Sequence, residues 1–210
     1  MGEELEIRCV EVGMFQGNCY LVKCDKAGHG VIIDPGDEPE RIRQEIRDMK
    51  IEPEVILLTH GHIDHANAAG AMRKAFRSRV VCHRSDGDML SGEEPTLWGL
   101  QRNPCTVDQE IADGETIAVG DRRFKVIHTP GHTKGSVCYM VDSILFSGDT
   151  LFSGSIGRTD LPGGSDREMA RTLRTRIATL DGNTVVYPGH GPSTTIEREI
   201  QFNPFLGRNG

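Results

Sequence analysis

The sequence lacks the features that mark membrane-embedded and secreted proteins. No apolar run is long enough to cross a bilayer, and the acidic start, Met-Gly-Glu-Glu-Leu-Glu, has no apolar signal core. The six cysteines include no C-x-x-C pair, so we expect reduced thiols, most of them small buried side chains. We therefore expect a cytoplasmic protein that has no membrane partner.

Basic residues are also too few for a nucleic-acid-binding surface. Lys and Arg number 24 against 31 Asp and Glu, and the net charge of -7 repels phosphate backbones. Neither a P-loop nor a G-x-G-x-x-G fingerprint is present, so nucleotide binding has no support. The expected partner is a small-molecule substrate, and the sequence does not predict the oligomeric state.

The length and composition are those of one globular domain. With 210 residues, of which 37% are hydrophobic and 26% charged, the chain can bury one sizeable core. We found no linker and no repeat of fixed period, so we expect a single domain over residues 1–210.

Short apolar runs between glycine-containing turns predict strands. They lie at residues 5–12, 18–24, 30–33, 55–58, 80–83, 116–119, 123–127, 136–141, 144–146 and 185–186. Apolar residues at helical spacing predict helices after an Asp37–Glu40 capping box, from Asp64 to about Phe76, after a Ser165–Glu168 capping box, and over 196–202. The order of strands, helix, strand and helix occurs twice, so the two halves share one plan.

The segment from Thr59 to His65 carries the strongest chemical signal. It reads Thr-His-Gly-His-Ile-Asp-His and follows a buried apolar strand. In an extended exit from a strand, residues i and i+2 point the same way, so His60 and His62 can aim at one point. Asp64 and His65 begin a helix and can aim at a second point. The alternative is a polar surface turn that carries its histidines by coincidence.

Three further candidates follow later strands. His132 stands in Thr-Pro-Gly-His-Thr, Asp149 in Ser-Gly-Asp-Thr, and His190 in Tyr-Pro-Gly-His-Gly. Loops at strand ends are a usual location for active-site residues.

These motifs closely resemble those of the metallo-β-lactamase superfamily, over residues 34–190. The resemblance implies an α/β fold, a four-layered αββα sandwich of two mixed β-sheets flanked by helices, with two metal ions at one edge. It assigns His60, His62 and His132 to the first metal, Asp64, His65 and His190 to the second, and Asp149 to both.

Within the superfamily the chain looks most like the glyoxalase II group, the hydroxyacylglutathione hydrolases, and their short bacterial relatives. The stretch from Gly154 to Asp160 and the ending Asn-Pro-Phe-Leu carry this similarity. It implies hydrolysis of a thioester such as S-lactoylglutathione by a hydroxide that bridges two metal ions, with Asp64 and Asp149 as catalytic residues. Full-length glyoxalase II continues into a helical domain that contacts glutathione, and we expect no such domain after His190.

The implied ligand set contains only nitrogen and carboxylate oxygen. This set favours zinc, with iron or manganese as alternatives. A mononuclear-iron persulfide dioxygenase has the same fold and a similar Gly-Arg-Thr-Asp stretch, and would use His60, His132 and Asp149 as iron ligands. A non-catalytic binding module is the third interpretation, which the complete ligand set disfavours.

Five further residues are candidates for supporting roles, each with an alternative. Asp34 and Thr59 can orient ligand histidines, or can belong to ordinary turns. Arg158 can dock a substrate carboxylate, or can pair with Asp160. Lys134 can attract an anionic substrate, or can be solvated. Tyr187 can face the metals, or can pack in the core.

Overall fold

Alternate residues of the central strands face two different hydrophobic cores. We describe residues 5–92 and 100–206 in a computed structural model. In strand β2 (Gly17–Lys23), Tyr20 and Val22 face one core, whereas Cys19 and Leu21 face another. Because successive side chains of a strand point to opposite faces, both faces of the sheet are buried. The continuous apolar runs in the sequence therefore mark strands that lie inside the protein.

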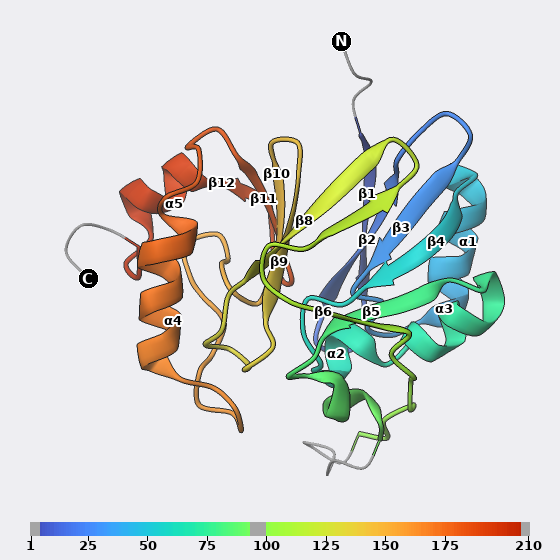
Figure 1. Cartoon of the computed structure of the whole chain (residues 1–210), viewed down its shortest axis with the longest axis horizontal. Coiled ribbons are helices and arrows are strands. Elements are labelled where there is room, and N and C mark those ends of the chain that lie inside the picture. The colour runs from blue at the N-terminus through green and yellow to red at the C-terminus, as the bar shows by residue number, and fades with distance from the viewer. Residues whose placement is uncertain (1–4, 93–99, 207–210) are drawn as a thin grey trace.

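Two mixed sheets form the centre of the described residues (Figure 1). The first has the order β1 (Glu6–Val12), β2, β3 (His29–Ile33), β4 (Glu52–Leu57), β5 (Arg79–His83) and β6 (Gln109–Ile111). The second has the order β12 (Thr194–Thr195), β11 (Val185–Pro188), β10 (Ile144–Gly148), β9 (Val137–Val141), β8 (Arg122–His128) and β7 (Thr116–Val119). Parallel pairs run from β3 to β6 and join β10 to β11; the other pairs are antiparallel.

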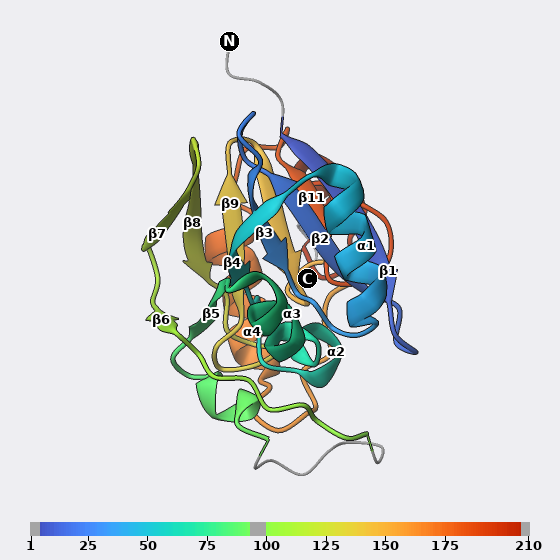
Figure 2. The ribbon, with the colours of Figure 1, turned by 90° about the vertical axis from the view of Figure 1, so that its right-hand side faces the viewer.

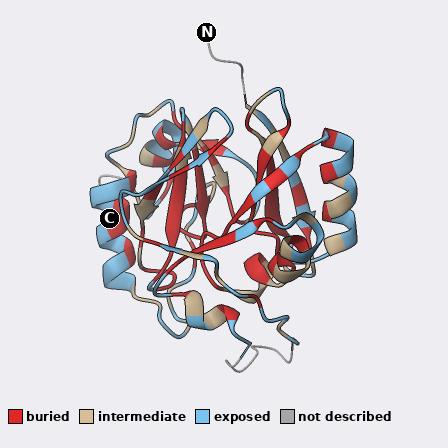
Figure 3. Ribbon diagram, turned by 45° about the vertical axis from the view of Figure 1, so that its right-hand side comes forward, coloured by how far each residue is buried: buried red, intermediate tan, exposed pale blue. Residues whose placement is uncertain are grey.

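Helices cover the outer face of each sheet. On the first sheet lie α1 (Pro39–Met49), α2 (Ile63–Ala66) and α3 (Ala69–Phe76), seen in front of the strands in Figure 2. On the second lie α4 (Asp166–Thr172), its π-helical continuation η3 (Leu173–Ile177) and α5 (Ile196–Phe202). A short 3-10 helix, η1 (Gly87–Leu90), follows β5. Figure 3 shows buried residues inside and exposed residues on the outer helix faces. The predicted αββα sandwich is confirmed.

The predicted capping box before α1 is wrong. The residue that caps this helix is Glu38, which has a left-handed backbone and makes no side-chain capping hydrogen bond. The Glu38 carboxylate instead accepts hydrogen bonds from the Gly13 N–H, at 2.9 Å, and from Arg41. A contact with a distant hairpin thus replaced the local cap that the spacing of Asp37 and Glu40 predicted.

The helix predicted from Asp64 to Phe76 is two helices. At the break, the Ala68 N–H donates to the Pro35 carbonyl at 2.9 Å rather than continuing α2. The turn that contains Pro35 also presses on the Asp64 carbonyl, because a Cβ on Gly36 would lie only 1.7 Å from that oxygen. The break therefore arises from tertiary contact with the end of β3, which helical periodicity does not record.

Other local predictions had mixed outcomes. Ser165 caps α4 by accepting from the Glu168 N–H, as predicted, whereas the short strands β6 and β12 were not predicted. All six cysteines are free thiols, and all except the exposed Cys9 are buried. Among residues 5–92 and 100–206, no helix has the length and apolar character needed to span a bilayer.

Candidate metal centre

The candidate ligands lie at one edge of the sandwich, where strands of both sheets end. His60 and His62 follow β4, and Asp64 and His65 lie in α2. From the second sheet come His132 after β8, Asp149 after β10 and His190 after β11. Because these second-sheet strands all run in the same direction, their carboxyl ends meet at this edge.

The side chains gather in two clusters whose possible ligand atoms lie within 4.8 Å of one another. The three-histidine cluster contains His60, His62 and His132, and the mixed cluster contains Asp64, His65 and His190. In the first, His62 Nδ1 lies 2.8 Å from His132 Nε2. In the second, His65 Nε2 lies 3.1 Å from His190 Nε2 and 3.6 Å from Asp64 Oδ2.

The Asp149 carboxylate lies between the two clusters. Its Oδ1 is 3.4 Å from His65 Nε2, and its Oδ2 is 3.4 Å from His132 Nε2 and 3.7 Å from His190 Nε2. The structure thus brings together all seven side chains that the resemblance assigns to metals. The assignment of each side chain to a particular metal ion remains a prediction.

The donor atoms at this site fit divalent cations. Two buried atoms of the cluster, His60 Nε2 and Asp149 Oδ1, make no hydrogen bond with any described residue. Buried polar atoms without partners are costly, and converging imidazole nitrogens and carboxylate oxygens are the ligands that zinc, iron and manganese accept. A bound cation would satisfy both atoms.

Electrostatics in the cluster depend on burial and on the carboxylates. Burial and the neighbouring His132 lower the pKa of His62 to about 3, which keeps its ring neutral. Burial alone would lower the pKa of His65 as well, but Asp149, Asp64 and Asp34 raise it to about 10. The carboxylates of Asp149, Asp64 and Asp34 therefore favour a positive charge at this site, and a divalent cation would supply it.

Asp34 fixes the orientation of two histidines. Its carboxylate accepts from the Thr59 N–H at 2.7 Å and from the Thr59 hydroxyl at 2.6 Å, and lies 3.2 Å from His65 Nδ1. Because a carboxylate only accepts, the hydrogen of the neutral His65 ring is on Nδ1. The Thr59 hydroxyl, having donated to Asp34, accepts from His60 Nδ1 at 3.0 Å. His60 therefore presents an unprotonated Nε2 to the cluster, and His65 would do so once a bound cation displaced the Nε2 hydrogen that its raised pKa retains.

A backbone carbonyl performs the same task for His132. His132 Nδ1 donates to the Arg158 carbonyl oxygen at 2.6 Å, which leaves Nε2 facing His62 and Asp149. The Arg158 guanidinium itself makes two 2.7 Å hydrogen bonds to Asp160 and is half exposed. The structure thus contains the ion pair that was the alternative for Arg158, and substrate docking stays a prediction.

Side chains of β2 hold the loop that carries His190, and the sequence did not predict these contacts. Asn18 Nδ2 donates to the Pro188 and Gly191 carbonyls, each at 2.9 Å, and the Tyr20 hydroxyl donates to the Pro188 carbonyl at 2.6 Å. Gly189 lies against the cluster, since a Cβ there would be 2.3 Å from Asp149 Oδ1. These contacts join residues about 170 positions apart, so no local pattern signals them.

Tyr187 and Lys134 are the other two residues that were predicted to contact substrate. The half-buried Tyr187 ring stacks on Phe146 at 5.6 Å and meets the edge of Tyr20 at 5.4 Å, which is the core packing that was its alternative. Lys134 is exposed. Direct contact of either residue with substrate stays a prediction.

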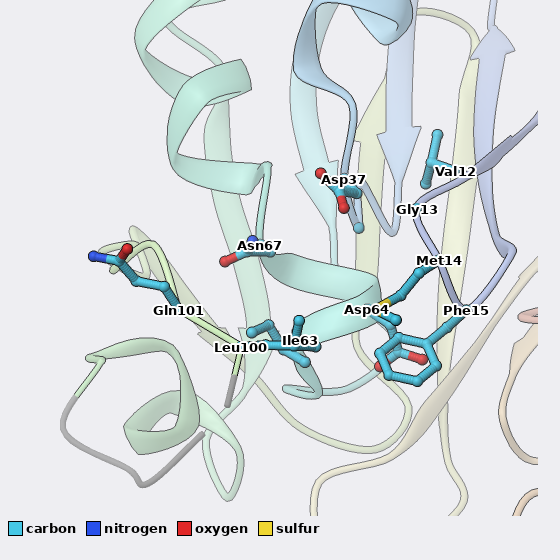
Figure 4. Close-up of a pocket in the computed structure, with 11 residues that line it drawn as sticks. Val12, Gly13, Met14, Phe15, Asp37, Ile63, Asp64, Asn67, Leu100 and Gln101 are labelled. Atoms are coloured by element: carbon cyan, nitrogen blue, oxygen red, sulfur yellow. The ribbon is translucent and has the colours of Figure 1, made fainter. Parts of the chain in front are cut away.

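A pocket of about 140 Å³ opens beside Asp64 (Figure 4). Its walls include the apolar residues Met14, Phe15, Ile63 and Leu100. Met14 is 74% exposed and belongs to the hairpin turn between β1 and β2. The pocket thus places apolar side chains beside Asp64, with room for a small organic group.

Comparison with known proteins agrees with this arrangement. A sequence model of the metallo-beta-lactamase superfamily matches residues 12–190. The chain belongs to this superfamily. A hydroxyacylglutathione hydrolase named GloC, from Haemophilus influenzae, is 34% identical over 96% of the chain and 98% of its own length.

Solved structures show the same fold. The B3 metallo-beta-lactamase BLEG-1 has a TM-score of 0.90 and 36% identity, over 96% of this chain and 99% of its own. The protein TTHA1623, solved in a di-iron-bound form, has a TM-score of 0.85 and 38% identity, over 95% of this chain and 100% of its own. The chain is a metal-dependent hydrolase of the metallo-β-lactamase fold, with His/Asp clusters suited to divalent metals.

Proposed function

We propose that this protein hydrolyses a thioester of the S-lactoylglutathione kind with two divalent cations. The observation that carries the proposal is the Asp149 carboxylate between two clusters whose ring nitrogens lie 3.4–3.7 Å from it. The similarity to GloC, which bears the name of a hydroxyacylglutathione hydrolase, supports the substrate class.

The seven side chains would divide between two cations, with zinc proposed as the native metal. His60, His62 and His132 would hold one, Asp64, His65 and His190 the other, and Asp149 would contact both. When bound, such ions polarise a carbonyl and bring the pKa of a bound water to about 7. Asp34, Thr59 and the Arg158 carbonyl hold the ring hydrogens away from the cations.

The kind of leaving group that this site can release depends on whether any side chain is left to act as a general acid. All seven are assigned to the cations, so none of them remains to protonate a departing group. A thiol has a pKa of about 8.5 and leaves as a thiolate without a strong general acid. Thioesters are therefore a better match to this site than substrates whose leaving group needs a proton.

The pocket beside Asp64 is proposed to take the acyl group. Its walls combine apolar side chains with the polar Asp37, Asn67 and Gln101, and its volume of about 140 Å³ suits a short acyl chain. We expect Met14→Ala to raise KM for acyl thioesters in proportion to chain length, because exposed Met14 forms part of that wall. Phe202→Ala, which removes an exposed ring from α5, is the matched control and should change nothing.

A mononuclear-iron persulfide dioxygenase is the second candidate, and the di-iron form of TTHA1623 is the observation that favours iron. Apo protein would be reconstituted separately with zinc and with iron. Each form would be assayed for S-lactoylglutathione hydrolysis, for oxygen uptake on glutathione persulfide, and for hydrolysis of a β-lactam. Thioester turnover with two metals per chain supports the proposal. Oxygen uptake with one iron per chain, or turnover of the β-lactam alone, overturns it.

A further inference from the structure

The carboxylate of Asp86, which the proposed reaction does not use, lies buried between two loops. Its side chain is only 1% exposed. Oδ2 accepts hydrogen bonds from the Gly61 N–H at 3.0 Å and from the Thr133 hydroxyl at 2.7 Å. Oδ1 accepts from the Gly135 N–H at 2.8 Å. Three donors on two separate loops thus converge on one anion.

These loops carry the whole three-histidine cluster. Gly61 separates His60 from His62 after β4 in the first sheet, and Thr133 follows His132 after β8 in the second. Asp86 stands after β5 and adds no ligand atom of its own to the cluster. Its carboxylate therefore joins the loop of His60 and His62 in the first sheet to the loop of His132 in the second.

Both peptide groups that flank Gly61 are held by hydrogen bonds. Asp86 accepts from the Gly61 N–H, which belongs to the peptide group shared with His60, at 3.0 Å. Arg102 Nη1 donates to the Gly61 carbonyl oxygen, which belongs to the peptide group shared with His62, at 3.0 Å. Neither peptide group can rotate without breaking a hydrogen bond, so the backbone of both His60 and His62 is restrained.

The packing leaves little space for the loops to shift. A Cβ on Gly135 would lie 2.5 Å from the Asp86 carboxylate carbon, and one on Gly61 would lie 2.8 Å from Met89 Cβ. Because neither glycine has a Cβ, the backbone at Gly135 can approach the Asp86 carboxylate and the backbone at Gly61 can approach Met89.

We propose that Asp86 is a positioning residue that sets the cation affinity of the three-histidine cluster by joining the loops of His60/His62 and His132. Only an ionised carboxylate accepts from three donors without presenting a hydrogen of its own. An asparagine would turn its NH₂ group toward at least one of these N–H or O–H donors, and the hydrogen bond from that donor would be lost. The proposal rests on the candidate metal centre and not on the proposed substrate, so it is tested by metal binding alone.

The test isolates each cluster and measures zinc affinity by competition with a chelator. In a His190→Ala background, which leaves the three-histidine cluster intact, Asp86→Asn should lower zinc affinity by roughly 10–100-fold, the usual effect of losing an outer partner of a ligand. In a His132→Ala background, which leaves the mixed cluster, the same change should leave zinc affinity unaltered. Equal losses in both backgrounds, or no loss in either, would overturn the proposal.

A matched control separates positioning from general damage to the fold. Glu199 is also fully buried and accepts from the Gly154 N–H, the Thr194 hydroxyl and Asn203 Nδ2, but bonds to none of the loops of the three-histidine cluster. Glu199→Gln should lower thermal stability without changing zinc affinity in the His190→Ala background. A loss of affinity as large as that of Asp86→Asn would show that any buried carboxylate has this effect, and would refute the proposal.

Substitutions at Thr133 test the same hydrogen bond if Asp86→Asn does not fold. Thr133→Val removes one of the three donors, and should lower zinc affinity in the His190→Ala background by a smaller factor. Thr133→Ser retains the hydroxyl and should restore the affinity. Equal affinity in the Val and Ser variants would contradict the role of this contact.

Discussion

Asp34→Asn should change which nitrogen of two ligand histidines is free. The side chain is 2% exposed, and its carboxylate accepts from the Thr59 N–H, the Thr59 hydroxyl and His65 Nδ1. In asparagine an NH₂ group replaces one oxygen. If that group faces His65, its hydrogen bond requires an unprotonated Nδ1, so the ring hydrogen moves to Nε2, the atom that faces the mixed cluster.

The relay through Thr59 extends the effect to His60. An NH₂ group at residue 34 turns the Thr59 hydroxyl into an acceptor, and its hydrogen then points toward His60 Nδ1. His60 would have to place its own hydrogen on Nε2, which otherwise faces the three-histidine cluster. Asparagine tolerates the left-handed backbone of Asp34, whose φ is 51°, so the change adds no backbone strain.

The magnitude follows from the hydrogen bonds that change. All three contacts change from charged to neutral hydrogen bonds, and hydrogen bonds to charged groups contribute about 1.5–3 kcal/mol each. Because the amide still forms bonds, the apo protein should lose no more than about 3 kcal/mol of unfolding free energy. Zinc affinity should fall by roughly 10–100-fold at each cluster, since both lose a correctly oriented imidazole.

The assay combines chelator competition with the ¹⁵N resonances of the histidine rings, which report the tautomer. In the neutral form of the His65 ring, recorded above its raised pKa, we expect the hydrogen on Nε2 in the apo variant and on Nδ1 in the apo parent protein. Thr59→Val is the matched comparison, because it removes only the relay to His60 and should weaken the three-histidine cluster alone. Two zinc ions bound by Asp34→Asn with unchanged affinity would refute this reasoning.

Three further predictions concern single side chains. Asp149→Ala should abolish turnover and lower the metal content at both clusters, and full content by elemental analysis would contradict its position between them. Arg158→Ala should raise KM more than it lowers kcat if the guanidinium docks substrate, whereas unchanged kinetics would leave it only the Asp160 ion pair. The hydrogen bond that His29 Nδ1 donates to the Asp25 carboxylate raises the pKa of His29, and that same bond lowers the pKa of Asp25. The pair therefore stabilises the fold between the ordinary pKa values of the two groups, and this contribution is lost as pH rises through the raised pKa of His29. Urea unfolding should show that loss in the parent protein and not in Asp25→Asn.

Local patterns predicted the parts of the fold that local physics determines. The apolar runs predicted strands, which are buried on both faces, and apolar residues at helical spacing predicted α1, whose inner face is formed by Ile42, Ile46 and Met49. The short segment from His60 to His65 indicated a metal site because its side chains leave a strand end together. The resemblance supplied the distant partners, which spacing alone did not identify.

Contacts between distant segments explain what the sequence did not predict. Glu38 caps α1 while its carboxylate bonds to Gly13, and the helix after Asp64 breaks where Ala68 bonds to Pro35. Asn18 and Asp86 organise the site through hydrogen bonds to loops that are far away in sequence. Neither residue lies in a recognisable motif, so only the three-dimensional arrangement reveals it.

The central claim is that five histidines and two aspartates form one centre for two metal ions. Its most direct test is a crystal structure of the protein reconstituted with zinc, with anomalous diffraction recorded on both sides of the zinc absorption edge. We predict two zinc peaks, one bounded by His60, His62 and His132 and one by Asp64, His65 and His190, with Asp149 in contact with both. A single peak, or zinc bound elsewhere on the chain, would contradict it.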